Sequence, residues 1–278
     1  MRLATLRTPT GTVAVRIDNG TAVELGVPDI GALLARDDWK AFAAAGAGPA
    51  HPLNSIERSA WAPVVPAPSK IVCVGLNYRS HILEMGRELP EYPTLFAKYP
   101  EAVIGPYDPI VLPAYAAQAL DWEGELAIVI GAAARRLDRD AAALAIAGYS
   151  VMNDLTMRDY QYRTPEWFQG KSFEKSAPFG PVLVTADDYG VDTELRTEVD
   201  GEVVQSAITD DLVFDPAALV SYISQIFTLN PGDVIASGTP GGVGHARKPP
   251  RYLVDGNSLS TSVEGIGTLV NQVIVEGD

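Results

Sequence analysis

The sequence predicts an α+β fold that is mainly β, with a small N-terminal α/β appendage. Short apolar runs ended by glycine or proline recur along the 278 residues, and the second half is rich in strand patterns. A proline-rich segment lies near residues 52–68, and a hydrophobic content of 47% supports a sizeable core. We therefore expect a small N-terminal domain over residues 1–68 and a larger domain over residues 69–278.

The N-terminal domain reads as a small β meander followed by one helix. Residues 1–26 alternate in the manner of short strands, and the Asn19-Gly20 pair suits a tight turn. Residues from Pro28 to about Ala45 are expected to form a helix.

The first half of the larger domain alternates between apolar strands and short helices. Strands are expected at 71–74, 110–113, 121–130 and 148–154, with an alanine-rich helix over 138–147. The chain breaks after residue 74 and enters a short polar, helix-like piece that carries His81.

The second half carries further strands and one clear helix. A strand is expected at 182–184, and residues 197–199 and 202–204 form a hairpin around Asp200-Gly201. Asp215-Pro216 has the form of an N-cap followed by proline at the first helical position, and an apolar stripe follows. The strand 233–236 then leads into a glycine-rich loop, 237–244, which is either a structural turn or a loop that cradles a ligand.

Charge and cysteine content exclude several classes of protein. The balance of 21 Lys and Arg against 35 Asp and Glu, a net charge of −14, argues against nucleic-acid and anionic-membrane partners, which require clustered positive charge. No apolar segment is long enough to span a bilayer, and the N-terminus lacks a signal-like apolar core. The single cysteine, Cys73, rules out an internal disulfide. A cytoplasmic protein is the expected result.

Three carboxylates fall at strand ends. Glu123 and Glu125 are two residues apart at the entrance of an apolar strand, so they point to the same face, and Asp154 ends another strand. Exposed acids facing water are one interpretation. The other is a site for a hard divalent cation such as Mg²⁺, Mn²⁺ or Ca²⁺, since oxygen-only ligands suit these ions better than zinc.

His81 and Glu84 are three residues apart in a stretch that can be helical. They share a face, and the carboxylate can hold the imidazole in one tautomer. The pair fits either a surface ion pair or a general-base dyad.

An ordered set of motifs resembles the fumarylacetoacetate hydrolase superfamily over roughly residues 69–275. The motifs are DWEGEL from Asp121, NDLTMRD from Asn153, GKSF from Gly170 and GTPGGVG from Gly238. The resemblance implies a mixed β-sheet roll and a homodimer. Trp122 and the Glu174-Lys175 pair depart from the usual pattern of the family, so the wall of the pocket is not predicted.

The resemblance also implies roles for individual residues. Mg²⁺ or Mn²⁺ would be held by Glu123, Glu125 and Asp154, and Lys171 would stabilise charge in the active site. His81 and Glu84 would activate water from a mobile lid. The implied substrate contacts are Arg158, Gln161, Gly238 and Thr239.

From these roles we expect a metal-dependent hydrolase that cleaves a C–C bond in a 1,3-diketo acid of the acylpyruvate or fumarylpyruvate type, as in the degradation of aromatic compounds. A decarboxylase or keto–enol isomerase acting on a 2-oxo diacid such as oxaloacetate needs the same cation and enolate, and is the alternative. A protein without catalytic activity, in which the acids only stabilise the fold, is a third possibility.

Overall fold

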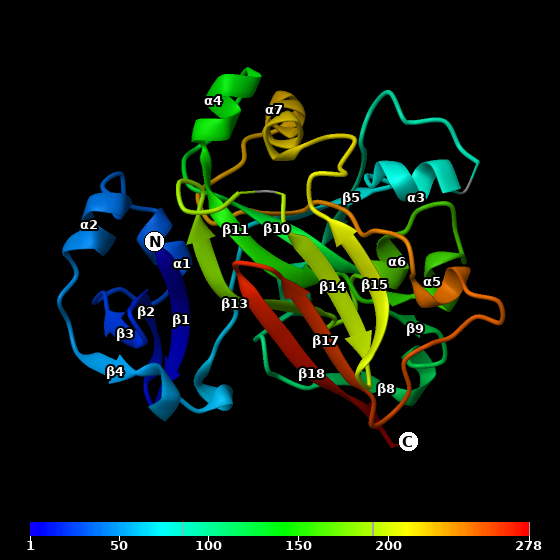
Figure 1. Ribbon diagram of the computed structural model, residues 1–278, viewed down its shortest axis with the longest axis horizontal. Coiled ribbons are helices and arrows are strands. Elements are labelled where there is room, and N and C mark those ends of the chain that lie inside the picture. The colour runs from blue at the N-terminus through cyan, green and yellow to red at the C-terminus, as the bar shows by residue number, and fades with distance from the viewer. Residues whose placement is uncertain (85, 191, 278) are drawn as a thin grey trace.

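The computed structural model describes residues 1–84, 86–190 and 192–277. Within these ranges the chain forms three β-sheets, with short helices on their faces and edges (Figure 1). Strands predominate, and the sheets contain both parallel and antiparallel pairs. The predicted class, α+β and mainly β with mixed sheets, is confirmed.

The largest sheet has eleven strands among the described residues and runs from the N-terminus to the centre of the molecule. The strand order is β4-β3-β2-β1-β13-β11-β10-β16-β5-β6, and β7 pairs with β13. Its strands are β1 (Arg2–Thr8), β2 (Gly11–Asp18), β3 (Thr21–Glu24), β4 (Ala50–Pro52), β5 (Ile71–Gly75), β6 (Thr94–Lys98), β7 (Val103–Ile104), β10 (Gly124–Ile130), β11 (Ile146–Asn153), β13 (Ala177–Thr185) and β16 (Val234–Ala236).

A second sheet packs across the first. Its five strands have the order β15-β14-β17-β18-β8, and a separate small sheet pairs β9 with β12. The strands are β8 (Ile110–Pro113), β9 (Leu120–Asp121), β12 (Thr156–Met157), β14 (Glu194–Val199), β15 (Glu202–Ile208), β17 (Ser258–Val263) and β18 (Gly267–Glu276). The predicted hairpin around Asp200-Gly201 is confirmed as β14 and β15.

The central strand β10 is buried along its whole length because both of its faces are covered. Leu126 and Ile128 belong to the core that includes Leu195 of the second sheet. Ala127 and Val129 belong to a different core on the opposite face. This alternation with a period of two fixes the direction of the side chains at the start of the strand, where Glu125 lies.

The helix predicted over residues 28–45 is two short helices, α1 (Ile30–Leu34) and α2 (Trp39–Ala45). The Asp29 side chain caps α1 by accepting a hydrogen bond from the Ala32 amide. Arg36-Asp37-Asp38 interrupts the helix, since aspartate competes with the helical backbone and favours turns and caps.

The helix predicted over residues 138–147 is shorter, because α4 (Arg139–Leu144) ends before β11 begins at Ile146. Ile146 pairs with Ile130 in the sheet, so sheet pairing overrides the helical propensity of the alanines.

The helix predicted from Asp215-Pro216 is confirmed as α7 (Pro216–Ile226). The Asp215 side chain accepts a hydrogen bond from the Ala218 amide, and the buried stripe Leu219, Val220 and Ile223 packs against the central core. The remaining helices are α3 (Arg79–Glu84), α5 (Arg158–Gln161), α6 (Phe168–Lys171), and the single 3₁₀ turns η1 (Leu53–Ser55), η2 (Arg58–Ala60), η3 (Pro100–Ala102), η4 (Ala114–Ala116) and η5 (Gly244–Ala246).

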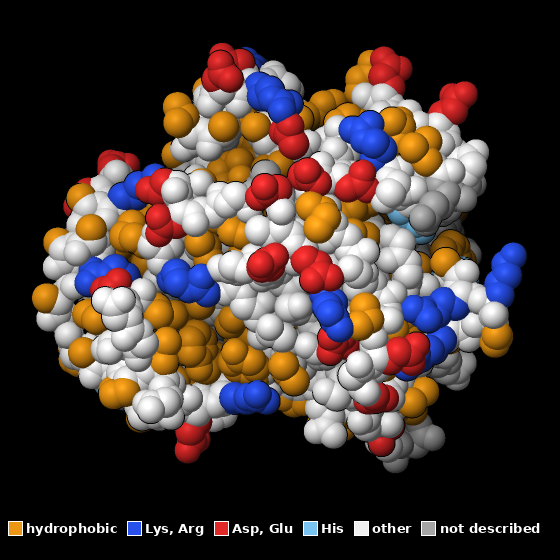
Figure 2. All heavy atoms as spheres, viewed as in Figure 1, with side chains coloured by type: hydrophobic (Ala, Val, Ile, Leu, Met, Phe, Trp, Pro, Cys, Tyr) orange, Lys and Arg blue, Asp and Glu red, His pale blue; other side chains and the backbone are white. Residues whose placement is uncertain are grey.

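The surface in Figure 2 carries acidic and basic side chains interspersed over the whole face. Hydrophobic side chains gather at the seam between the N-terminal strands and the second sheet, where Ile17, Trp61 and Ile266 line a cavity of about 350 Å³. None of the helices in the described part of the chain has the length and hydropathy that crossing a bilayer requires.

Candidate active site

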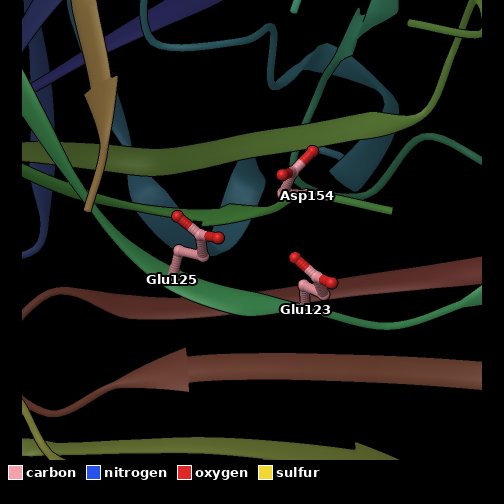
Figure 3. A group of neighbouring side chains, drawn as sticks. All are labelled: Glu123, Glu125 and Asp154. Carbon is pink, nitrogen blue, oxygen red and sulfur yellow. The ribbon is translucent and has the colours of Figure 1, made fainter. Parts of the chain in front are cut away.

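The three predicted acids meet at one point (Figure 3). Glu123, Glu125 and Asp154 each offer a carboxylate oxygen within 4.8 Å of the others, and all three residues are buried. The sheet brings them together because β10 and β11 are antiparallel neighbours, so the start of one strand lies beside the end of the other. Figure 3 shows the three side chains as close neighbours, with Asp154 above Glu123 and Glu125 in this view. The cluster can hold a divalent cation.

Glu123 does not lie on one continuous strand with Glu125, as predicted, but between β9 and β10. Its backbone is bonded to residues at the end of β11, although Glu123 itself lies outside the strands. The Glu123 amide donates to Asn153 Oδ1 at 3.0 Å, and its carbonyl accepts from the Asp154 amide at 2.8 Å. These bonds hold two of the three acids together independently of their side chains.

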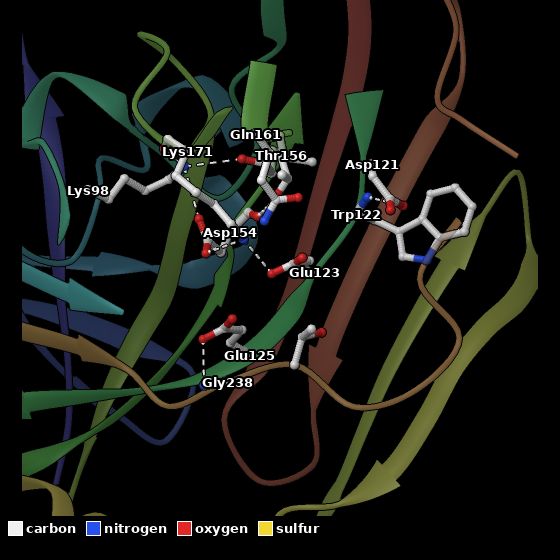
Figure 4. A network of polar contacts seen from close by, with 12 residues as sticks. Lys98, Asp121, Trp122, Glu123, Glu125, Asp154, Thr156, Gln161, Lys171 and Gly238 are labelled. Carbon is white, nitrogen blue, oxygen red and sulfur yellow. Dashed lines mark hydrogen bonds and ion pairs between the residues drawn. The ribbon is translucent and has the colours of Figure 1, made fainter. Parts of the chain in front are cut away.

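Two buried lysines neutralise part of the acid cluster (Figure 4). Lys171 Nζ lies 2.6 Å from Glu123 Oε2 and 2.8 Å from Asp154 Oδ2. Lys98 Nζ lies 3.0 Å from Asp154 Oδ1 and also contacts the carbonyls of Leu155 and Lys171. Burial disfavours the charged ammonium, but Asp154 and Glu123 outweigh it and raise the pKa of Lys171.

Arg158 joins the cluster to a fourth acid. Its Nη2 lies 2.7 Å from Glu123 Oε1, its Nε donates to Asp121 Oδ2 at 2.8 Å, and its Nη1 donates to Gln161 Oε1 at 2.9 Å. Burial by itself would lower the pKa of the guanidinium, but the negative charges of Glu123 and Asp121 have the larger combined effect and raise it. Arg158 therefore stays charged, and Gln161 is left with its amide N–H groups as donors.

Glu125 is the acid of the cluster with the fewest positive neighbours. Its Oε2 accepts a hydrogen bond from the Gly238 amide at 2.8 Å, and no lysine or arginine of the described residues forms an ion pair with it. Burial raises the pKa of Glu125 well above its usual range, and the charges of Asp154 and Glu123 add to the shift. A cation bound among the three acids would supply the missing positive charge, so the residues present fit a divalent metal ion.

The cluster reaches a cavity of about 300 Å³ through Glu123, the one acid of the three among its described lining residues. Its lining includes the predicted site residues His81, Arg158, Gln161, Lys171 and Thr239, together with Glu123.

Two predicted site residues are placed differently. Gly238 is not among the described residues that line this cavity, and its amide is bound to Glu125. The side chain of Glu84 lies outside the described residues, so its pairing with His81 stays a prediction.

Three residues of the site were not predicted as such. Lys98 ends a strand in an otherwise apolar run, and a lysine there is the only local signal. Asp121 was noted within a motif, but its role in holding Arg158 depends on the fold. His245 lines the cavity directly after the glycine-rich loop, and its position next to that loop could have marked it.

Solved structures share this fold over the whole chain. A fumarylacetoacetate hydrolase from Exiguobacterium antarcticum is 34% identical, with a TM-score of 0.89, and the match covers 99% of this chain and 100% of that one. A 5-carboxymethyl-2-hydroxymuconate delta-isomerase from Mycobacterium smegmatis is 38% identical, with a TM-score of 0.81, and the match covers both chains completely.

Curated relatives overturn the predicted reaction. The mitochondrial oxaloacetate tautomerase FAHD2A of Homo sapiens is 42% identical over 214 residues, which cover 76% of this chain and 68% of the human protein. The oxaloacetate tautomerase YisK of Bacillus subtilis is 41% identical over 214 residues, covering 75% and 71%. Both names describe an isomerisation, and both relatives have a higher sequence identity to this chain than the structure named as a hydrolase. The prediction of C–C bond hydrolysis is therefore wrong, and the comparisons favour its alternative.

A model of the fumarylacetoacetate hydrolase C-terminal domain matches residues 70–274, which include every residue of the acid cluster and of the cavity named above. Together with the relatives and the shared fold, this match confirms the resemblance seen in the motifs. The chain is an enzyme of the fumarylacetoacetate hydrolase family.

Proposed function

We propose that this enzyme catalyses keto–enol tautomerisation of a 2-oxo diacid such as oxaloacetate. The observation that carries the proposal is the identity of about 41–42% to relatives named as oxaloacetate tautomerases, over about three quarters of the chain. The cavity supports it, since buried cationic side chains surround the acids where an enolisable 2-oxo acid would place its oxygens.

The cofactor in this proposal is Mg²⁺ or Mn²⁺, held by Glu123, Glu125 and Asp154. Three carboxylates within 4.8 Å of one another form an oxygen-only donor set, which these ions prefer. When bound, such an ion acts as a Lewis acid toward the negative charge that develops on the substrate oxygens during enolisation.

The protein contributes the binding and the proton transfer. In this proposal Arg158 and the amide of Gln161, which line the cavity, hold the substrate carboxylate, and Lys171 adds positive charge beside the same acids. Thr239 donates its hydroxyl hydrogen to the Gly124 carbonyl and accepts from Gln205, so its position on the cavity wall is fixed. Preorganised donors of this kind stabilise an enolate more than they stabilise the ketone.

His81 is the proposed proton carrier. It lies in α3 and lines the cavity, and tautomerisation needs one group that moves a proton between the enol oxygen and C3 of the substrate. Water is neither consumed nor released in this reaction. Assembly as a homodimer is a further proposal, based on the family resemblance.

The test follows the enol form of oxaloacetate by its ultraviolet absorbance, with Mg²⁺ present and the uncatalysed rate subtracted. The enzyme should accelerate loss of the enol, with no release of CO₂ and no cleavage of acylpyruvates. Glu125→Gln should lower the catalysed rate about 100-fold or more, because it removes a charged ligand. Glu57→Gln, an exposed site in the N-terminal segment, is the matched control and should leave the rate unchanged.

Chelation supplies a second arm of this test. EDTA should abolish the acceleration, and Mg²⁺ or Mn²⁺ should restore it. Decay of the enol at the uncatalysed rate with the wild-type enzyme would refute the proposal, and stoichiometric CO₂ release would assign the site to decarboxylation.

A further inference from the structure

His245 lies in the wall of the active-site cavity and has no role in the function proposed above. It is the central residue of η5 and is partly exposed. It lines the same cavity as Arg158 and Gln161, on a segment far in sequence from the helix that carries His81. A second histidine therefore faces the substrate space.

The backbone of His245 is fixed by the acid that orients Arg158. Its amide donates to Asp121 Oδ2 at 2.9 Å, and the amide of Gly244 donates to Asp121 Oδ1 at 2.6 Å. The turn requires glycine before the histidine, because a Cβ on Gly244 would lie 1.9 Å from the Arg251 carbonyl oxygen. One carboxylate thus sets the positions of a histidine and an arginine that both line the cavity.

The imidazole ring is held by two tyrosines. Nδ1 lies 2.8 Å from the Tyr252 hydroxyl, and the Tyr162 ring stacks on the imidazole with centroids 5.0 Å apart and an angle of 33°. When the hydroxyl donates to Nδ1, the neutral ring carries its hydrogen on Nε2. No partner for Nε2 is found among the residues that the structure describes. In this tautomer the ring presents an oriented N–H donor that is not bonded to any described residue.

The charged groups in the cavity indicate which part of the substrate the Nε2 donor could bind. Lys171 is already paired with Glu123 and Asp154, and Arg158 with Glu123 and Asp121. A 2-oxo diacid brings a second carboxylate, at the end of the molecule away from its 2-oxo acid group. Arg158 and the Gln161 amide are assigned above to the carboxylate of the 2-oxo acid group, so the distal carboxylate needs a donor of its own.

We propose that His245, oriented by Tyr252 and Tyr162, binds the distal carboxylate of the substrate and so selects 2-oxo diacids over 2-oxo monoacids. This inference rests on the proposed function, since it names the part of the site that recognises the second carboxylate. Arg87, an exposed residue that also lines the cavity, is the competing candidate.

The test is a pair of unreactive ligands that differ in the distal carboxylate. Oxamate carries the 2-oxo acid end alone, and oxalylglycine is oxamate extended by a carboxymethyl group. Calorimetric titration of the Mg²⁺-loaded wild type should show tighter binding of oxalylglycine. His245→Phe keeps an aromatic ring against Tyr162 and should weaken oxalylglycine about 10- to 100-fold, the range expected for a lost hydrogen bond to a charged group. The dissociation constant of oxamate should change less than about twofold in the same variant.

Three further variants sharpen the result. Tyr252→Phe should weaken the binding of oxalylglycine by a smaller factor than His245→Phe. It removes the hydrogen bond that orients the imidazole ring but leaves Nε2 in place. His51→Phe, at the histidine that pairs with Glu24 outside the cavity, should change neither ligand. Arg87→Met should have less effect than His245→Phe. Thermal melting of each variant checks that it is folded.

The inference is overturned if the wild type binds oxalylglycine and oxamate equally well. It is also overturned if His245→Phe lowers the affinity for both ligands equally or for neither, or if only Arg87→Met removes the preference for oxalylglycine. These outcomes are separate from failure of the proposed function, because ligand binding needs no turnover. Loss of the preference in His245→Phe supports the inference even if enol decay is not accelerated.

Discussion

Glu125 and Asp154 belong to one cluster, yet their surroundings shift their pKa values in opposite directions. Burial raises the pKa of Glu125, the nearby Asp154 and Glu123 raise it further, and the charge of Lys171 and one backbone amide oppose them without cancelling the shift. Burial acts on Asp154 in the same sense, but Lys171 and Lys98 outweigh it and lower its pKa. Glu125 is therefore the acid of this pair that keeps its proton to the higher pH when no cation is bound.

Metal binding should consequently release a proton. A divalent ion binds carboxylate and not carboxylic acid, so Glu125 must lose its proton, and apparent Mn²⁺ affinity should fall as pH drops through the raised pKa. Calorimetric titration with Mn²⁺ in two buffers of different ionisation enthalpy measures the released protons. Glu125→Gln should abolish the release and weaken binding, whereas Glu57→Gln should behave as wild type. The same binding enthalpy in both buffers would contradict the prediction.

The acid cluster was predictable from the sequence, but its neutralising partners were not. Glu123, Glu125 and Asp154 are marked locally, since each stands at the end of an apolar run. Lys98 reaches Asp154 only because β6 and the end of β11 meet in the folded chain, and no spacing in the sequence records that contact. His245 is similar, because its bond to Tyr252 depends on the path of a loop.

Single elements were predictable where their signals are local. α7 has its N-cap, its proline and its apolar stripe within one stretch of sequence, so its start at Asp215-Pro216 was predicted correctly. The helix over 138–147 was predicted too long, because Ile146 belongs to β11 and pairs with Ile130 of β10. The sequence around the helix does not record this pairing. Boundaries set by sheet pairing are therefore the ones that sequence patterns miss.

The cap of α7 provides a test at this scale. Asp215→Ala removes the bond to the Ala218 amide and should lower the free energy of unfolding by about 1 kcal/mol, measured by urea denaturation. Asp215→Asn is the matched control and should keep most of the stability, since asparagine also caps helices. Equal losses in the two variants would show that the ion pair with Arg139, and not the cap, stabilises the helix. The rate of enol decay in the assay proposed above should be the same in both variants as in the wild type, because no residue of α7 lines the cavity.

At the scale of the whole molecule, the N-terminal strands continue the sheet that carries the site. β1 pairs with β13, and β13 pairs with β11, at whose end Asp154 lies. Ala4 and Val15 share one core with Val182, and Leu3 shares the other with Leu183. The proline-rich segment near residues 52–68 suggested a domain boundary. A sequence pattern, however, does not show whether the segments on either side bury their apolar faces against each other. The division at residue 68 stays a prediction.

Removing residues 1–68 tests that division directly. The remaining chain, 69–278, would expose the edge of β13 and the apolar side chains that now face β1 and α1, a combination that favours aggregation. We expect this fragment to lack a cooperative thermal transition and to aggregate in size-exclusion chromatography. Addition of residues 1–68 as a separate chain should restore a soluble complex that binds Mn²⁺, because the lost contacts are non-covalent. A fragment 69–278 that melts cooperatively by itself and binds Mn²⁺ as the full chain does would instead establish two independent domains, with the N-terminal strands added to a sheet that is already stable.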